Sequence, residues 1–367
     1  MARVPDAEVE RIKAEVSLQR LVEARGIELR RHGADLVGLC PFHDDHEPSL
    51  VISPARNLWH CMGACGAGGS VIDWIMRTDG LSFRHALELL RDGRAPVGTG
   101  GAPKRGSVRR LPPPVEASAA DAELLSQVVA YYHATLTESP EALAYLARRR
   151  IDHPEAIARF RLGYANRTLG YRLPARNRKD GATLRGRLIG LGVLRASGHE
   201  HFAGSLVVPV ADEAGVVTEL YGRKLLDNLR AGTPAHLYLP GPHRGVWNPE
   251  ALAASSEIVL CESLVDALTF WCAGFRHVTA AYGTEGFTTD HAEAFAASGV
   301  ARVLIAYDRD PAGDRAAAAL AAELMAAGVE CFRVLFPHGA DANEVACSAT
   351  SATEALGRAI RGAEWMG

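Results

Sequence analysis

Two pairs of potential metal ligands stand in the first fifth of the chain. Cys40 and His43 form one pair, Cys61 and Cys65 form the other, and together they read C-x2-H-x17-C-x3-C. Each pair follows a short apolar run and precedes turn residues, so a hairpin between the pairs would bring the four side chains together. His60 is not included, because adjacent side chains on a strand point to opposite faces. Thiolates and imidazole suit a tetrahedral ion with no open position, so the pattern predicts a structural zinc site.

A second group of chemically capable side chains is acidic and follows predicted strands in the last third of the chain. Glu262 follows IVLC, Asp308 and Asp310 follow VLIAY, Asp341 lies beyond the next strand, and Asp266 stands one helical turn after Glu262. A single Asp at a helix start is usually an N-cap, so the set carries the argument. Oxygen ligands of this kind hold Mg²⁺ or Mn²⁺, which binds phosphates and activates a hydroxyl. We predict Glu262, Asp308 and Asp310 as catalytic, and all five as metal ligands.

The elements that must position these carboxylates alternate regularly. Strands EIVLCE, HVTAAYG, RVLIAYD and ECFRVLF are separated by helical segments of similar length. This rhythm predicts a parallel sheet with right-handed crossovers, in which ligands lie at the carboxyl ends of the strands.

The remaining sequence indicates a multi-domain α/β protein. A helical lead-in over residues 5–25 precedes short apolar runs typical of a small antiparallel sheet, and two helical segments follow. Over residues 94–118, Gly and Pro prevent regular structure, and several residues are basic. We expect a zinc-binding domain at 1–93, a basic Gly/Pro-rich linker at 94–118, a mixed α+β subdomain at 119–252, the parallel-sheet domain at 253–347, and a tail or the start of a further segment at 348–367.

Composition restricts the class of protein. The 367 residues are 48% hydrophobic and 23% charged, which is typical of folded soluble domains. The formal net charge of −3 gives no overall sign of nucleic-acid binding, so any basic surface must be local. Seven cysteines, three of them between residues 40 and 65, fit a reducing compartment with a metal site better than a disulfide scaffold. No stretch is apolar enough to cross a bilayer, and we expect a cytoplasmic protein without a membrane partner.

Specific stretches resemble a known family. CPFHDDHEPSLVISPARNLWHCMGACGAGGSVIDWIM resembles the zinc ribbon of DnaG-type bacterial primases, although that family usually has two residues between the last two cysteines. Glu262 with YDRDPAGDRAA resembles their Toprim domain, which places that domain at 253–347, and residues 144–165 and FAGSLVVPVADEAGVVTELYGRKL resemble the polymerase core between. The resemblance implies synthesis of short RNA primers on single-stranded DNA from nucleoside triphosphates, with structural Zn²⁺ and catalytic Mg²⁺ or Mn²⁺.

The same resemblance bears on the nucleic-acid contacts. It implies contacts to template phosphates from the basic residues Arg150, Arg223, Lys224 and Arg244. One departure concerns Ala203 and Ser205, which stand where the family normally has two arginines.

Three hypotheses of different classes remain open. Besides a primase, the carboxylates would serve a Toprim-type nuclease, and loss of the arginine pair at Ala203 and Ser205 would suit a degenerate primase that acts as a single-stranded DNA-binding module. The zinc pattern and the middle region favour the primase over the nuclease. Because the chain ends soon after the Toprim region, we expect either a fragment of a longer polypeptide or a primase of a mobile element or defence system. Its partner would be a helicase or another replication or defence protein.

Overall fold

The computed structural model describes residues 4–91, 113–116, 118–174, 179–212, 214–226, 229 and 232–367. Contacts divide the chain into two compact units. The first unit consists of Met1–Tyr131, Ala165–Gly204 and Leu226–Thr233, and the second of Tyr132–Tyr164, Ser205–Leu225 and Pro234–Gly367. Residues on both sides of the boundary expected at residue 252 belong to the second unit. Most of the expected linker at 94–118 lies outside the described residues. Among the described helices, none has the length and apolar character needed to cross a membrane.

The zinc pattern lies in a small antiparallel sheet of the first unit, as expected. Its strands run in the order β1-β2-β3-β4-β5, at Arg30–His32, Asp35–Gly38, Leu50–Ser53, Leu58–Cys61 and Gly68–Gly69. Helices α3 (Val71–Asp79) and α4 (Phe83–Arg91) follow, and Ser70 and Asp73 form a capping box at the start of α3. Buried Leu50, Ile52, Trp59 and Trp74 form the core of this module.

The helical lead-in is two helices, α1 (Asp6–Glu15) and α2 (Leu18–Ala24). The interruption between α1 and α2 is stabilised by hydrogen bonds from side chains to backbone groups. The Ser17 hydroxyl accepts a hydrogen bond from Arg20 N, and the side chain of Asn57 accepts one from Leu18 N while donating to the Val16 carbonyl. These side chains satisfy backbone groups that a continuous helix would satisfy internally. The first unit also contains α8 (Leu169–Arg172) and α9 (Lys179–Gly190), while α5 spans Asp121–Thr137.

The second unit contains an antiparallel sheet in the order β6-β7-β8-β9, with strands at Gly163–Tyr164, Ser205–Ala211, Val217–Lys224 and His236–Tyr238. Helices α6 (Pro140–Arg148) and α7 (Pro154–Arg159) precede it. Its register pairs Arg223 on β8 with His236 on β9. Directly paired residues of an antiparallel sheet carry their side chains on the same face, so these two side chains lie side by side.

The second sheet of this unit is the predicted parallel one. Its order is β11-β10-β12-β13-β14, with strands at Val278–Ala280, Glu257–Cys261, Arg302–Ala306, Glu330–Arg333 and Glu364–Trp365. The first four strands are parallel, and β14 joins the edge antiparallel to β13. Residues 348–367, expected as a tail or a further segment, thus form α15 (Ala352–Arg361) and a strand of this sheet.

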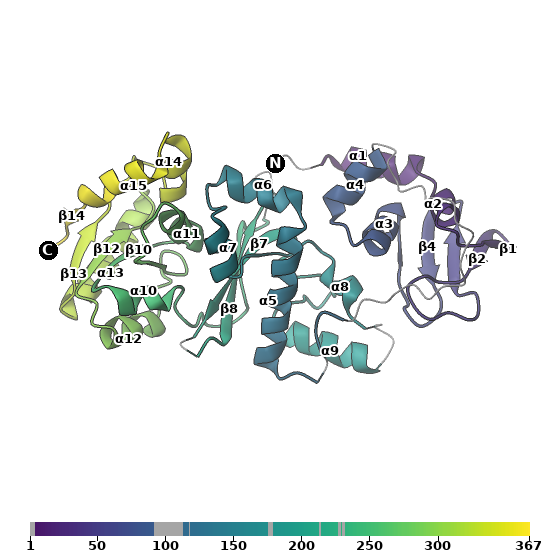
Figure 1. Cartoon of the computed structure of the whole chain (residues 1–367), viewed down its shortest axis with the longest axis horizontal. Coiled ribbons are helices and arrows are strands. Elements are labelled where there is room, and N and C mark those ends of the chain that lie inside the picture. The colour runs from purple at the N-terminus through teal and green to yellow at the C-terminus, as the bar shows by residue number, and fades with distance from the viewer. Residues whose placement is uncertain are drawn as a thin grey trace. The chain divides into compact units, whose positions relative to one another are not determined.

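Alternate residues of the central strands face two helical layers. Ile258, Leu260, Val303 and Ile305 pack with α10 (Pro249–Ala254), α12 (Thr289–Ala297) and α13 (Pro311–Ala326). The residues between them pack with α11 (Leu264–Cys272), α14 (Ala342–Ser348) and α15. Figure 1 shows α14 and α15 on one side of the strands and α10 and α12 on the other. The chain leaves β10 and β12 toward opposite faces, which opens a crevice between their carboxyl ends.

Candidate functional site

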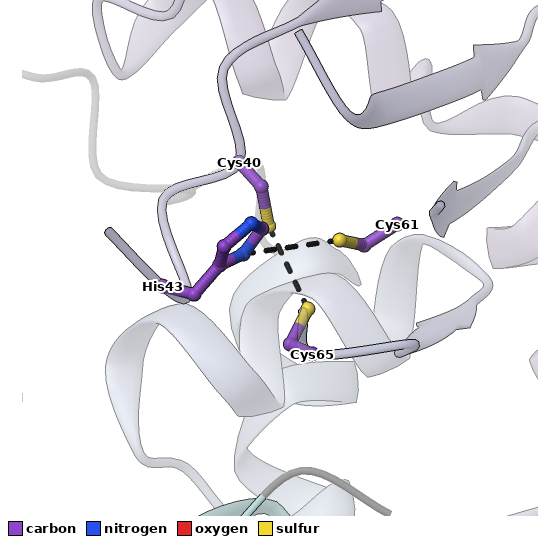
Figure 2. A group of neighbouring side chains, drawn as sticks. All are labelled: Cys40, His43, Cys61 and Cys65. Carbon is purple, nitrogen blue, oxygen red and sulfur yellow. Dashed lines mark hydrogen bonds between the residues drawn. The ribbon is translucent and has the colours of Figure 1, made fainter. Parts of the chain in front are cut away.

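The four predicted zinc ligands come together in the first unit. Cys61 ends β4, Cys40 and His43 follow β2, and Cys65 lies in the turn before β5 (Figure 2). The ligand atoms all lie within 4.8 Å of one another, with Cys40 Sγ 3.7 Å from Cys65 Sγ and Cys61 Sγ 3.8 Å from His43 Nδ1. Two sulfurs bound to one tetrahedral zinc ion at about 2.3 Å lie about 3.8 Å apart. The set therefore fits a structural zinc ion.

The carboxylate of Asp45 contacts two of the predicted zinc ligands. Asp45 Oδ1 lies 3.2 Å from His43 Nε2, and Asp45 Oδ2 accepts hydrogen bonds from Cys40 N at 2.6 Å and Ser49 Oγ at 2.7 Å. Because Nε2 faces a carboxylate, it carries the proton and leaves Nδ1 as the metal-binding nitrogen. His60 lies outside the group, as the alternation along the strand predicted.

The predicted carboxylates lie at the crevice of the second unit, on a pocket of about 330 Å³. Four of the five line it, namely Glu262, Asp266, Asp308 and Asp341. Glu262 directly follows β10, Asp308 lies just beyond β12, and Asp341 caps the start of α14. Among the described residues they do not form a group as close as the zinc ligands. Oxygen donors spaced around a pocket suit a hydrated divalent cation, which keeps several waters.

Asp310, the fifth of the predicted carboxylates, has a structural role. Its Oδ1 accepts hydrogen bonds from Ala312 N at 2.9 Å and Gly313 N at 2.7 Å, so it is the N-cap of α13, and it is not among the pocket-lining residues. Gly313 allows this turn to pack against the loop that carries Asp308, because a Cβ there would lie 2.3 Å from the Asp308 carbonyl oxygen. A role for Asp310 in metal binding stays a prediction.

The loop that carries Asp308 is held by a buried arginine on β13. Arg333 Nη1 donates to the Tyr307 carbonyl at 2.8 Å, and Nη2 donates to the Asp308 carbonyl at 2.9 Å and to Asp314 Oδ1 at 2.9 Å. The guanidinium thereby satisfies backbone carbonyl groups just beyond the end of β12. These hydrogen bonds from Arg333 hold the backbone at Asp308 in place.

Burial and mutual repulsion raise the pKa values of three pocket carboxylates. Burial, with the charges of Glu262 and Asp341, raises the pKa of Asp308 to about 7. Burial and the nearby Asp310 and Asp341 raise the pKa of Glu262, against a hydrogen bond from Asp308 N. Asp266 is almost fully buried, and burial followed by the charges of Asp341 and Asp308 raises its pKa well above the ordinary value. A divalent cation would relieve this repulsion, so the electrostatics fit the predicted metal.

Two arginines provide the positive charge of the same pocket. Arg223, predicted from the sequence, lines it, together with Arg149, which sequence reasoning missed in favour of its neighbour Arg150. Arg150 lies in the left-handed region with φ of 55° and does not line the pocket, and neither do Lys224 and Arg244. Contacts of these three residues to nucleic acid stay predictions.

His236 and Tyr221 hold Arg223. Arg223 Nη1 is hydrogen-bonded to His236 Nε2, and His236 Nδ1 lies 2.9 Å from the Tyr221 hydroxyl oxygen. A guanidinium has no acceptor, so Nε2 must accept and Nδ1 carries the proton. Desolvation, with the charges of Arg223 and Arg149, lowers the pKa of His236 to about 4, which keeps the ring neutral. Tyr238, two residues further on β9, also lines the pocket.

Ala203 and Ser205, which stand where the resembled family normally has two arginines, are not exposed in this structure. Ser205 begins β7 and is completely buried, and its hydroxyl has no hydrogen-bond partner in this structure. Ala203 is half-buried in the preceding turn. The basic groups that line the described pocket are Arg149, which caps the end of α6, and Arg223 on β8.

Comparisons with known proteins agree with this arrangement. Residues 4–95 match the family model of the CHC2 zinc finger, and residues 259–346 match the Toprim-like model. The DNA primase of Listeria innocua is 28% identical over 334 residues, which cover 86% of this chain and 52% of that protein. The DNA primase of Chlamydia trachomatis is 29% identical over 339 residues, with 86% and 52% covered. The chain thus spans about half the length of the curated relatives that it matches.

Solved structures show the same fold. The zinc-binding and RNA polymerase domains of Aquifex aeolicus primase superpose with a TM-score of 0.56 at 24% identity, covering 98% of this chain and 86% of that one. A DnaG primase catalytic domain bound to single-stranded DNA has a TM-score of 0.56 at 23% identity, covering 67% of this chain and 79% of that one. With the CHC2 zinc finger preceding the Toprim-like domain in sequence, the chain is similar to DNA primases in sequence and to DnaG-type primases in fold.

Proposed function

We propose that the chain synthesises short RNA primers on single-stranded DNA by metal-dependent nucleotidyl transfer. One observation carries the proposal: a single pocket at the crevice between β10 and β12 combines four carboxylates with two arginines. Such a pocket suits a polyanionic substrate that arrives with a divalent cation. The names of the relatives, DNA primase in organisms as distant as Listeria and Chlamydia, support the same activity.

The residues of the pocket divide into two chemical roles. Glu262, Asp308 and Asp341, with the buried Asp266 behind them, would hold Mg²⁺ or Mn²⁺. When bound, the cation neutralises phosphate charge and lowers the pKa of an attacking 3′-hydroxyl. Arg149 presents a cationic group to phosphate oxygens in the same pocket, as Arg223 does. Fixing both signs of charge before the substrate arrives reduces the cost of orienting a nucleoside triphosphate.

The zinc module has a different proposed role. Its four ligands leave no position for a substrate, so the ion stabilises a small domain whose core is limited. We propose that this module contacts the single-stranded template, as the family resemblance implies. The partner that recruits the protein to DNA, a helicase or another protein, belongs to the same proposal.

Primer synthesis on a single-stranded template tests the activity. The protein is incubated with labelled ribonucleotides and either Mg²⁺ or Mn²⁺, beside Asp308→Asn and Glu257→Gln. Glu257 begins β10 at the opposite end of the strand from Glu262 and forms an exposed ion pair with Arg302, so it is a matched control for loss of a carboxylate. We expect templated oligomers from the unchanged protein and from Glu257→Gln, and none from Asp308→Asn.

Other outcomes would replace the proposal. Shortened template without synthesis would identify a nuclease that uses the same carboxylates. Retention of template in a gel-shift assay, without either reaction, would identify a DNA-binding module. Product of equal yield from Asp308→Asn would show that the chemistry lies elsewhere. Deoxynucleotides run in parallel determine which sugar the site accepts.

A further inference from the structure

Asn343 is a buried polar residue that none of the proposed chemistry uses directly. It lies in the first turn of α14, two residues after Asp341, and only 1% of it is exposed. Its side chain makes hydrogen bonds with Arg149 and with Thr269, which are separated from it by 194 and 74 residues of sequence. These hydrogen bonds fix the orientation of the buried amide. Both of its hydrogen-bond partners lie on elements that line or support the pocket.

The contact with Arg149 is reciprocal. Arg149 Nη1 donates to Asn343 Oδ1 at 2.9 Å, and Asn343 Nδ2 donates back to the Arg149 carbonyl oxygen at 2.8 Å. Arg149 is the C-cap of α6, so its carbonyl is one of the groups that the helix leaves unsatisfied. One amide group therefore fixes both the backbone and the guanidinium of the same residue. Because a guanidinium is planar, fixing one of its nitrogens restricts the direction of its other donors.

The same residue reaches the acidic side of the pocket. Asn343 N donates to Asp266 Oδ1 at 3.1 Å, and its Nδ2 also donates to Thr269 Oγ1 at 2.7 Å on α11, the helix that carries Asp266. The Ser263 hydroxyl donates to the other oxygen of Asp266 at 2.6 Å. Asn343 thus links three helices, α6, α11 and α14, that supply an arginine and two carboxylates to one pocket.

We infer that Asn343 is a positioning residue that aims Arg149 at a phosphate of the substrate while holding Asp266 at a fixed distance from it. The inference rests on the proposed function for the chemical class of the ligand, a polyphosphate with a divalent cation. Asn343 touches neither substrate nor cation and acts through Arg149. Orientation of a charged donor before binding strengthens binding, because the ligand does not have to order that side chain.

A purely structural role for Asn343 makes a different prediction, and Thr269 separates the two. Thr269→Val is nearly isosteric and removes one hydrogen bond of Asn343 Nδ2, while the two bonds between Asn343 and Arg149 remain. If Asn343 only supports the packing of α11 and α14, Thr269→Val and Asn343→Ala should have similar effects on the pocket. If it positions Arg149, only Asn343→Ala should weaken phosphate binding.

The test is calorimetric titration of the full chain with inorganic tripolyphosphate and Mg²⁺. We expect Arg149→Met and Asn343→Ala each to raise Kd about tenfold or more, since each removes or misdirects a charge-assisted hydrogen bond, and Thr269→Val to change it less than about twofold. In the double variant Arg149→Met with Asn343→Ala, Kd should equal that of Arg149→Met alone, because the second change has no arginine left to act through.

Three results would overturn the inference: equal losses from Thr269→Val and Asn343→Ala, losses that multiply in the double variant, or no tripolyphosphate binding by the unchanged protein. Thermal unfolding and zinc content establish that each variant is folded. If Asn343→Ala does not fold, Asn343→Ser takes its place, because its shorter side chain cannot span to Arg149 Nη1, and the same loss is expected. Primer synthesis is measured separately, so the proposed function can fail while the positioning role stands, and the reverse.

Discussion

Replacing Asp308 by asparagine should stabilise the metal-free protein while abolishing the activity proposed for it. The substitution keeps the shape of the side chain and removes a charge that burial, Glu262 and Asp341 all disfavour. Stability and function are therefore expected to move in opposite directions at this one position. Such opposition is common where a site is built to bind a cation that is absent during the measurement.

The size of the effect follows from the pKa. A rise from the ordinary 3.8 to about 7 in the folded protein means that folding favours the protonated acid. The contribution of protonated Asp308 to the free energy of unfolding is fully present below about pH 4, and it is lost as the pH rises through about 7. The full shift is worth about 4 kcal/mol, but the side chain is only partly buried, so screening by water reduces the expected figure to about 1–2 kcal/mol. For a unit of this size that is roughly 2–8 °C in Tm.

Calorimetric unfolding in buffers freed of Mg²⁺ and Mn²⁺, without a chelator that would remove zinc, measures the difference. At pH 8 Asp308→Asn should unfold at the higher temperature, and at pH 4 the two proteins should coincide. Added Mg²⁺ should raise the Tm of the unchanged protein more than that of the variant. Glu257→Gln, which is changed at the far end of β10 and keeps Asp308, should follow the unchanged protein at both pH values to within about 1 kcal/mol. A variant that is equally or less stable at pH 8, or a difference that persists at pH 4, would refute the electrostatic reasoning.

Three further predictions concern other parts of the molecule. Cys61→Ala should lose zinc, from about one ion per chain to none by elemental analysis, whereas Cys331→Ala, a buried cysteine on β13, should retain it. His236→Gln, which keeps an acceptor for the neighbouring pocket arginine, should hold the tripolyphosphate Kd within about threefold, and His236→Leu should raise it about tenfold; equal values for the two variants would contradict the tautomer assigned above. Arg333→Met should cost about 3–5 kcal/mol in denaturant unfolding because it leaves carbonyls and a carboxylate unpaired inside the fold, while the exposed Arg302→Met should cost less than about 1 kcal/mol; similar losses would show that the hydrogen bonds of the buried Arg333 contribute little.

The places of the zinc ligands and of the carboxylates in the fold could be predicted from the sequence for different reasons. The zinc ligands form two pairs, each within five residues, and one hairpin is enough to join them. The carboxylates are distant in sequence, but a parallel sheet brings every strand's carboxyl end to one edge, so the strand rhythm alone places Glu262 beside Asp308. The direction of a side chain does not follow from that argument: the Asp310 carboxylate caps α13, and its role in metal binding stays a prediction.

The basic side of the pocket could not be predicted from spacing. Three arginines follow one another where α6 ends, and only the first of them lies within the helix, so neither helical spacing nor family resemblance along the chain identifies which one faces the pocket. In the structure Arg149 lines the pocket, and a contact of Arg150 with nucleic acid stays a prediction. His236 depended on the register between β8 and β9, which a connection of about a dozen residues leaves undetermined in the sequence. Once the register is known, the pairing of Arg223 with His236 follows directly.

The division of the chain also has a consequence for how the protein is made. The second unit is assembled from three stretches, Tyr132–Tyr164, Ser205–Leu225 and Pro234–Gly367, with parts of the first unit between them. Arg149 finds Asn343 only after 194 further residues have been added. During synthesis from the N-terminus, the zinc module has all its ligands early, whereas the pocket cannot form until residue 343 has left the ribosome. Contacts of such long range also slow folding, so the second unit should be the later and slower of the two to form.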